Sequence, residues 1–204
     1  MLKRTTINHI NIILEKNKNW KILDIGCGYR AHKNATVIAD QKDLSAFYPN
    51  RAFVKINDKK LPFKDDEFDF VVASHVIEHV DDLNFFLNEI ERISSKGYIE
   101  LPSKLSDNLV FENKSDHIWW FEFNDTYNKL IASKRKQIVE PFLTVSMGKL
   151  FEEIFRDSLI LELYWEEKID YKIENNLKYN NYKKITFLKL IKKYFSKKIR
   201  TFIK

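Results

Sequence analysis

One stretch, KILDIGCGYRAHKNATVIAD (residues 21–40), constrains the fold more than any other part of the chain. Two apolar runs, each typical of a buried strand, flank the glycines Gly26 and Gly28. Only seven residues, Tyr29 to Ala35, separate Gly28 from the second run, TVIAD. A crossover between parallel strands normally contains a dozen or more residues and a helix, yet seven or eight extended residues already reach about 25 Å. We therefore predict an extended or single-turn crossover in place of that helix.

The rest of the first half alternates predicted strands and helices. We expect a helix over residues 7–16 and another that starts after Asp81 or Asp82. The runs AFVKI (52–56), FDFVVAS (68–74) and GYIELP (97–102) predict three more strands. This order predicts an α/β fold with a doubly wound, mostly parallel sheet.

The second half is less regular. We expect helices near residues 125–133 and 147–155, and HIWWF (117–121) in a loop or at a helix start. The segments SLILELYW (158–165) and KIDYKIE (168–174) alternate apolar and polar residues and predict a closing antiparallel hairpin.

Length, apolar content and cysteine count indicate the class of protein and its compartment. The chain has 204 residues, 44% of them apolar, which suits one globular domain. No run approaches the roughly 18 apolar residues of a membrane-spanning helix, and the N-terminal residues lack the pattern of a signal peptide. With a single cysteine, Cys27, an internal disulfide is excluded. We expect a cytoplasmic protein that could also associate with the inner face of the membrane.

The positive charge is concentrated at the C-terminus. From Asn175 onward the chain has ten Lys or Arg and no acid, which leaves a net charge of −4 on the residues before it. As a helix, residues 183–204 place Leu188, Phe195 and Ile199 opposite the basic side chains. We expect a domain over 1–175 and a basic amphipathic tail over 176–204 that contacts an anionic membrane surface or a partner protein. Docking on the sheet and RNA binding stay open, but the rich apolar face argues against nucleic acid.

A strand, then glycines, then a strand that ends in an acid is the arrangement that holds a nucleoside. The segments DIGCG, VIAD, LPFKDDEFDFVVASHVIEHV and RISSKGYIELP occur in this order between Trp20 and Pro102. Together they resemble the class I S-adenosylmethionine-dependent methyltransferases, most closely those with an LPF, FD and EHV pattern. The resemblance implies a Rossmann-like methyltransferase fold with S-adenosylmethionine as cofactor.

The resemblance also assigns residues. Asp24, Gly26 and Gly28 would hold the methionine part, and Asp40 the ribose hydroxyls. The adenine contact would come from Asn57 or Asp58, since the family usually has an acid with three residues between it and its Leu, and that position is Asn57 here. The remaining contacts would be made by Leu61 beside the base and by Ser74 and His75 near the methyl donor.

A dinucleotide-dependent dehydrogenase is the main alternative for this pattern. Gly26, Gly28 and Ala31 satisfy a loose dinucleotide fingerprint. Asp40, however, lies fourteen residues after Gly26, short of the roughly twenty expected. The missing crossover helix also removes the helix N-terminus that would bind a pyrophosphate. We therefore favour a donor without phosphate.

Histidines are the candidate catalytic residues. His79 is the first candidate base and His117 the second, although methyl transfer can proceed without a protein base and His79 can equally pack or cap. Asp116, Trp119 and Trp120 could stack on a sugar or planar acceptor, or belong to the core. His75 and His79 have a spacing seen in metal sites, but the sequence places no third ligand, so we expect no metal.

These observations predict an enzyme that transfers the methyl group of S-adenosylmethionine to an acceptor hydroxyl or amine. We expect a small-molecule or glycan acceptor, including lipid-linked cell-surface intermediates, because a membrane-binding tail suits such substrates. The alternative is an inactive methyltransferase-like subunit that docks through its basic tail.

Overall fold

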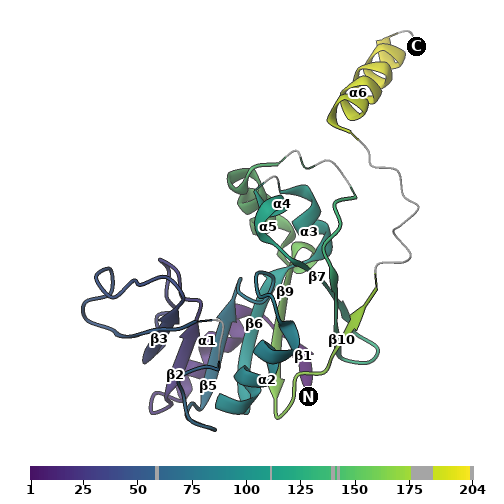
Figure 1. The fold of residues 1–204 in the computed structure, drawn as a ribbon. Coiled ribbons are helices and arrows are strands. Elements are labelled where there is room, and N and C mark those ends of the chain that lie inside the picture. The colour runs from purple at the N-terminus through teal and green to yellow at the C-terminus, as the bar shows by residue number, and fades with distance from the viewer. Residues whose placement is uncertain (58–59, 111, 139–140, 142, 176–185, 203–204) are drawn as a thin grey trace.

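The computed structural model describes residues 1–57, 60–110, 112–138, 141, 143–175 and 186–202 (Figure 1). Its main feature is a seven-stranded sheet with the strand order β1-β9-β6-β5-β2-β3-β4. The five strands from β6 to β4 run parallel, while β9 is antiparallel to both β6 and β1. The strands are β1 (Leu2–Arg4), β2 (Ile22–Ile25), β3 (Val37–Asp40), β4 (Ala52–Lys55), β5 (Phe70–Ser74), β6 (Lys96–Pro102) and β9 (Ile160–Glu166). The predicted α/β fold with a mostly parallel sheet is confirmed.

The shortened first crossover is also confirmed. β2 and β3 pair in parallel, and the chain between them forms turns without a helix. β2 starts the doubly wound arrangement, because the strands that follow it in sequence lie on both of its sides.

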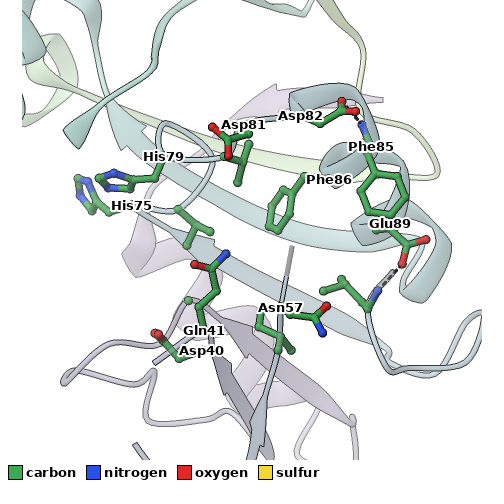
Figure 2. A pocket seen from close by; sticks show the side chains of 15 residues that line it. Asp40, Gln41, Asn57, His75, His79, Asp81, Asp82, Phe85, Phe86 and Glu89 are labelled. Carbon is green, nitrogen blue, oxygen red and sulfur yellow. Dashed lines mark hydrogen bonds between the residues drawn. The ribbon is translucent and has the colours of Figure 1, made fainter. Parts of the chain in front are cut away.

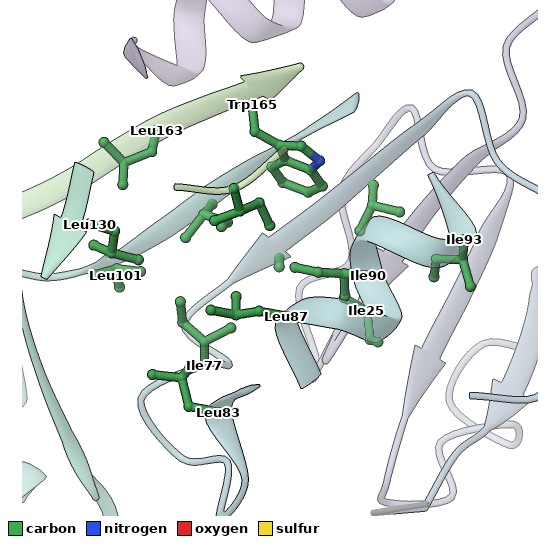
Figure 3. Close-up of a cluster of buried hydrophobic side chains, with 14 of the residues drawn as sticks. Ile25, Ile77, Leu83, Leu87, Ile90, Ile93, Leu101, Leu130, Leu163 and Trp165 are labelled. Atoms are coloured by element: carbon green, nitrogen blue, oxygen red, sulfur yellow. The ribbon is translucent and has the colours of Figure 1, made fainter. Parts of the chain in front are cut away.

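Each face of the sheet carries its own core. Alternate residues of a strand point to opposite faces, so Leu23 and Ile25 belong to one cluster and Ile22 to the other. Helix α2 (Leu83–Ile93) covers the first face with Leu87 and Ile90, which are fully buried (Figure 3). Helix α1 (Ile7–Lys16) covers the second face. Both helices begin where the sequence predicts, and the side chain of Asp82 caps α2 by accepting from the backbone N–H of Phe85 at 2.9 Å.

The second half differs from the prediction. A three-stranded sheet, in the order β10-β8-β7, contains β7 (Trp119–Asn124), β8 (Lys129–Lys134) and β10 (Tyr171–Glu174). The predicted helix near 125–133 and the loop at HIWWF are therefore wrong. β7 and β8 instead form an antiparallel hairpin that buries Phe121 and Leu130 against the α2 face.

The predicted hairpin of residues 158–165 and 168–174 is also wrong. β9 does pair antiparallel, but with β6 and β1, while β10 joins the small sheet parallel to β8. The chain reverses at Glu167, which has a left-handed φ of 67°, and then buries Ile169 completely. Alternating residues fit any strand edge equally well, so the pattern could not choose the partner.

Three further helices, α3 (Lys104–Leu109), α4 (Asn113–Asp116) and α5 (Val145–Leu159), follow β6 and precede β9, and α5 covers the expected 147–155. α6 (Phe187–Phe202) is a helix within the predicted tail, and Leu188 and Ile199 on its apolar side are 76% and 57% exposed. In the part of the chain that the structure describes, no helix has the length and apolar character needed to cross a membrane.

We predict that Gly97→Ala severely destabilises the fold. A Cβ at this position of β6 would lie 1.9 Å from the Trp165 ring and 2.4 Å from the carbonyl oxygen of Val71. Overpacking in a core costs about 1 to 3 kcal/mol, occasionally more, and here a rigid ring and backbone must both move. Urea unfolding should show a loss at the top of this range, whereas Gly148→Ala in α5, which meets Val110 at 3.1 Å, should change stability little.

Candidate functional site

A cavity of about 300 Å³ opens at the carboxyl edge of the parallel strands (Figure 2). Its walls come from the ends of β3, β4 and β5 and from the start of α2. Of the predicted cofactor residues, Gly26, Asp40, Asn57, Leu61 and His75 line it, as does the candidate base His79. The sequence analysis missed its other lining residues: Gln41, Ile56, Val76, Val80, Asp81, Asp82, Phe85, Phe86 and Glu89. The position of Gln41 directly after the acid of β3 was the available signal for one of them.

The crossover beside this cavity is held by side chains. Tyr48 Oη accepts from the N–H of Ala31 at 3.0 Å and donates to the carbonyl of Gly28 at 2.9 Å. Arg51 donates to the carbonyls of His32 and Ala35 at 3.1 and 2.6 Å. These bonds satisfy backbone groups that a helix would otherwise pair internally.

Asp24 also holds the crossover between β2 and β3 in place. The residue is only 4% exposed, and its carboxylate accepts from the N–H of His32 at 2.6 Å. Asp24 is not among the cavity-lining residues, so its role here is to fix the crossover. Burial raises its pKa to about 6, although the His32 N–H and the Arg51 charge act in the opposite direction.

Asp40 joins the crossover to the cavity. One carboxylate oxygen accepts from the N–H of Gly28 and the other from the N–H of Lys42, each at 2.9 Å. Gly28 thus acts through its backbone and does not line the cavity. Gly26 does line it, with a φ of 69°, and a Cβ there would lie 2.4 Å from a methyl carbon of Val76. A left-handed backbone with no space for a side chain requires glycine at this position.

The opposite wall is formed by residues near β4 and α2. Asn57 lines the cavity, while Asp58, the other candidate for the adenine contact, lies outside the described residues. Leu61 is 4% exposed, and its N–H donates to Glu89 of α2 at 2.7 Å. Arg92 pairs with Glu89 and lowers the pKa of that carboxyl.

His75 stands at the end of β5 with a left-handed φ of 55°. Its Nδ1 lies 3.2 Å from Glu78 and its Nε2 3.3 Å from Glu100. Burial opposes its protonation, but the hydrogen bonds to Glu100 and Glu78 outweigh it and raise the pKa of His75 to about 10. Ser74 donates to Glu100 at 3.3 Å and does not line the cavity. The raised pKa favours the protonated form of His75 at neutral pH, which makes it a poor general base.

A second cavity of about 220 Å³, which we name the polar cavity after its charged and amide side chains, also borders His75. Asn113, His117, Lys149 and Glu152 are among its lining residues. His117 and His79 stand edge to face, with ring centroids 4.6 Å apart. The two candidate bases therefore come together, one from the wall of each cavity, although 37 residues separate them in sequence.

The aromatic segment is structural. Trp119 and Trp120 are 6% and 1% exposed, and their indole N–H groups donate to the carbonyl of Val80 and the carboxylate of Asp107 at 2.8 and 2.7 Å. Neither residue can stack on an acceptor in this arrangement. The core interpretation of these two residues is the one that the structure supports.

Residues 23–99 match a family model described as a methyltransferase domain. This segment is a class I methyltransferase domain. It contains every predicted cofactor residue and every residue that lines the first cavity. Strand β9 and the small sheet lie outside this segment and contribute buried residues to the core on the α2 face. The match supports S-adenosylmethionine as the cofactor of the methyltransferase domain.

Several known proteins are similar to the chain. An uncharacterized protein of Methanocaldococcus jannaschii, MJ0638, is 35% identical over 119 residues, which is 50% of each protein. The chain thus spans about half the length of this curated relative. Among solved structures, the PH0226 protein of Pyrococcus horikoshii matches with a TM-score of 0.44, 16% identity and coverage of 78% of this chain and 89% of that one. A SAM-dependent methyltransferase of Aquifex aeolicus matches with a TM-score of 0.43 and 12% identity, and the match covers 78% of this chain and 87% of that one. The fold assignment itself depends on the sheet order and the family match.

We predict that Asp24→Asn makes the protein less sensitive to pH. Because the folded pKa of about 6 exceeds the unfolded value of about 3.9, the stabilising contribution of Asp24 is complete below pH 4 and is lost as the pH rises to 6. Asn keeps an oxygen for the His32 N–H but cannot ionise. Relative to the parent chain, the variant should gain about 2 kcal/mol in unfolding free energy between pH 4.5 and 7, measured by urea denaturation. Equal pH dependence of both chains would contradict the burial argument.

Proposed function

We propose that this protein transfers the methyl group of S-adenosylmethionine to a hydroxyl or amine of an amphiphilic acceptor, such as a lipid-linked glycan intermediate. The observation that carries the proposal is the placement of Gly26, Asp40 and His75 around one cavity at the carboxyl edge of a parallel sheet. A volume of about 300 Å³ is at the lower end of the range for ligand pockets. The sulfonium supplies an already activated methyl group, so the chain has to align donor and acceptor.

The residues present fit this cofactor. Asp40 offers a carboxylate to ribose hydroxyls, with its orientation fixed by the Gly28 and Lys42 N–H groups. Leu61 and Phe86 provide apolar walls for a purine, and Asn57 provides a polar edge. The described residues between Gly28 and β3 form no helix, which suits a cofactor without a pyrophosphate.

The acceptor side supports a substrate with both polar and apolar parts. The polar cavity beside His75 shares Ser106, Val110 and Gly148 with a third cavity of about 330 Å³. That third cavity is lined almost entirely by apolar side chains, among them Leu105, Leu109, Leu143, Phe151 and Phe155. A polar head next to His75 and a chain along the apolar cavity would fill both spaces.

The tail adds a reason to expect such a substrate. α6 has exposed apolar residues, including Leu188, and a strongly basic composition. An amphipathic helix of this type binds an anionic membrane surface. It would hold the domain where a lipid-linked acceptor resides, at the inner face of the membrane. A partner protein is the alternative occupant of the tail.

We predict that Asp40→Asn weakens binding of S-adenosylhomocysteine by about 10- to 100-fold, because a hydrogen bond to a charged group is worth about 1.5 to 3 kcal/mol. Calorimetry on the full chain measures this. Asp43→Asn is the matched control, since Asp43 is an acid of the next loop and bonds only Ser45 among the described contacts. Equal affinity in all three proteins would remove the ribose assignment. No binding to the folded parent chain would favour the inactive-subunit alternative.

We predict that deletion of residues 176–204 abolishes sedimentation with liposomes that contain anionic lipid and leaves S-adenosylhomocysteine binding unchanged. The tail carries ten basic residues, each worth about 1 kcal/mol near such a surface. Neutral liposomes provide the control for the electrostatic contribution. Equal sedimentation of the full and shortened chains would exclude the membrane role.

A further inference from the structure

Three side chains that could bind a metal ion meet beside His75. One carboxylate oxygen of Glu78 and one ring nitrogen each from His79 and His117 lie within 4.8 Å of one another. Glu78 and His79 are in the turn after β5, and His117 follows α4. Two imidazoles and one carboxylate form a ligand set that divalent transition metals accept.

Both imidazoles are oriented by hydrogen bonds at the other ring nitrogen. Nδ1 of His79 lies 3.0 Å from the carbonyl oxygen of Asp116, and Nδ1 of His117 bonds the buried carboxylate of Asp107. Because these oxygens accept, Nδ1 carries the proton in each ring and Nε2 retains its lone pair. This arrangement is the one that orients histidine ligands in metalloproteins.

Asp107 is itself held firmly. Its second oxygen accepts from Trp120 at 2.7 Å and from Arg135 at 2.6 Å, and the residue is 1% exposed. The support behind His117 is therefore rigid and buried.

Glu78 supplies an independent observation. The residue is fully buried, and while its Oε1 faces His75, its Oε2 has no hydrogen-bond partner within the described structure. A buried carboxylate oxygen without a partner is rare and costly. The backbone carbonyl of Glu78 accepts from the N–H groups of Ile118 and Trp119 at 2.8 and 3.2 Å, which fixes the turn against the segment that carries His117.

We propose that Glu78, His79 and His117 bind a divalent transition-metal ion at the junction of the cofactor cavity and the polar cavity. His79 lines the first cavity and His117 lines the second. Metal–ligand distances of about 2.0 to 2.2 Å require the three ligand atoms, which lie within 4.8 Å of one another, to move closer together on binding, and His79 is the exposed member of the set. The open coordination positions would face the two cavities.

The chemical role follows if the proposed function is correct. A metal-bound acceptor hydroxyl has a lowered pKa and gives its proton to water. Its oxygen then forms a bond to the methyl carbon as the carbon–sulfur bond of the sulfonium breaks, and S-adenosylhomocysteine leaves as a neutral thioether. In this proposal His79 and His117 would act as metal ligands instead of the bases that the sequence predicts, and the proposal departs from the expectation of no metal. The third ligand comes from His117, which sequence spacing could not place.

Zinc titration of the chelator-treated full chain tests the proposal. We expect one zinc ion per chain by calorimetry and by equilibrium dialysis with metal analysis. His79→Ala and Glu78→Gln should each weaken zinc binding by more than the about 10- to 100-fold that loss of an outer-shell partner costs. His79 is exposed, so its variant should fold, which circular dichroism verifies. The control is His9→Ala, an exposed histidine on α1, which should bind zinc like the parent chain.

Two results would overturn the proposal: zinc affinity unchanged in both His79→Ala and Glu78→Gln, or no uptake of zinc, cobalt or manganese by the folded parent chain. Titration of the same samples with S-adenosylhomocysteine separates this outcome from failure of the proposed function. Cofactor binding without metal uptake contradicts only the metal site. Metal uptake without cofactor binding supports the metal site and contradicts the methyltransferase proposal.

Discussion

The short connection between β2 and β3 is the constraint on which the rest of the site depends. Seven residues cannot form a crossover helix and still return to the start of the next strand. Their backbone groups are paired instead by Asp24, Asp40, Tyr48 and Arg51. Because Asp40 is both a part of this support and a wall of the cavity, the fold of the crossover and the shape of the cofactor site are set by the same carboxylate.

The first half of the fold and the donor side of the site follow from the sequence, because their determinants are local. Continuous apolar runs identify the buried strands, and the spacing between Gly28 and TVIAD predicts the missing helix. The second half does not, because strand alternation in 119–134 and 158–174 does not specify a pairing partner. The contacts of Asp24 and Ser74 were also beyond sequence reasoning: Asp24 bonds the backbone of His32 in the irregular crossover, and Ser74 bonds Glu100 of the neighbouring strand.

His75 forms part of the wall of two cavities and lies next to two carboxylates. The carboxylates are those of Glu78 and Glu100, and the cavities are the cofactor cavity and the polar one. Burial raises the pKa of Glu100, but hydrogen bonds from His75 and Tyr98 bring it down to about 2. A protonated His75 between the fully buried Glu78 and the partly buried Glu100 holds this wall together by charge. The second oxygen of Glu78 has no hydrogen-bond partner in the described structure, and a carboxylate oxygen of this residue lies within 4.8 Å of a ring nitrogen of His79 and of His117.

A crystal structure of the full chain with S-adenosylhomocysteine tests the central claim most directly. The account predicts electron density in the cavity between Gly26, Asp40 and His75, with both ribose hydroxyls within hydrogen-bonding distance of the Asp40 carboxylate and the sulfur next to His75. Density for the compound at another place, or a cavity closed by the protein's own side chains in crystals saturated with it, would contradict the account.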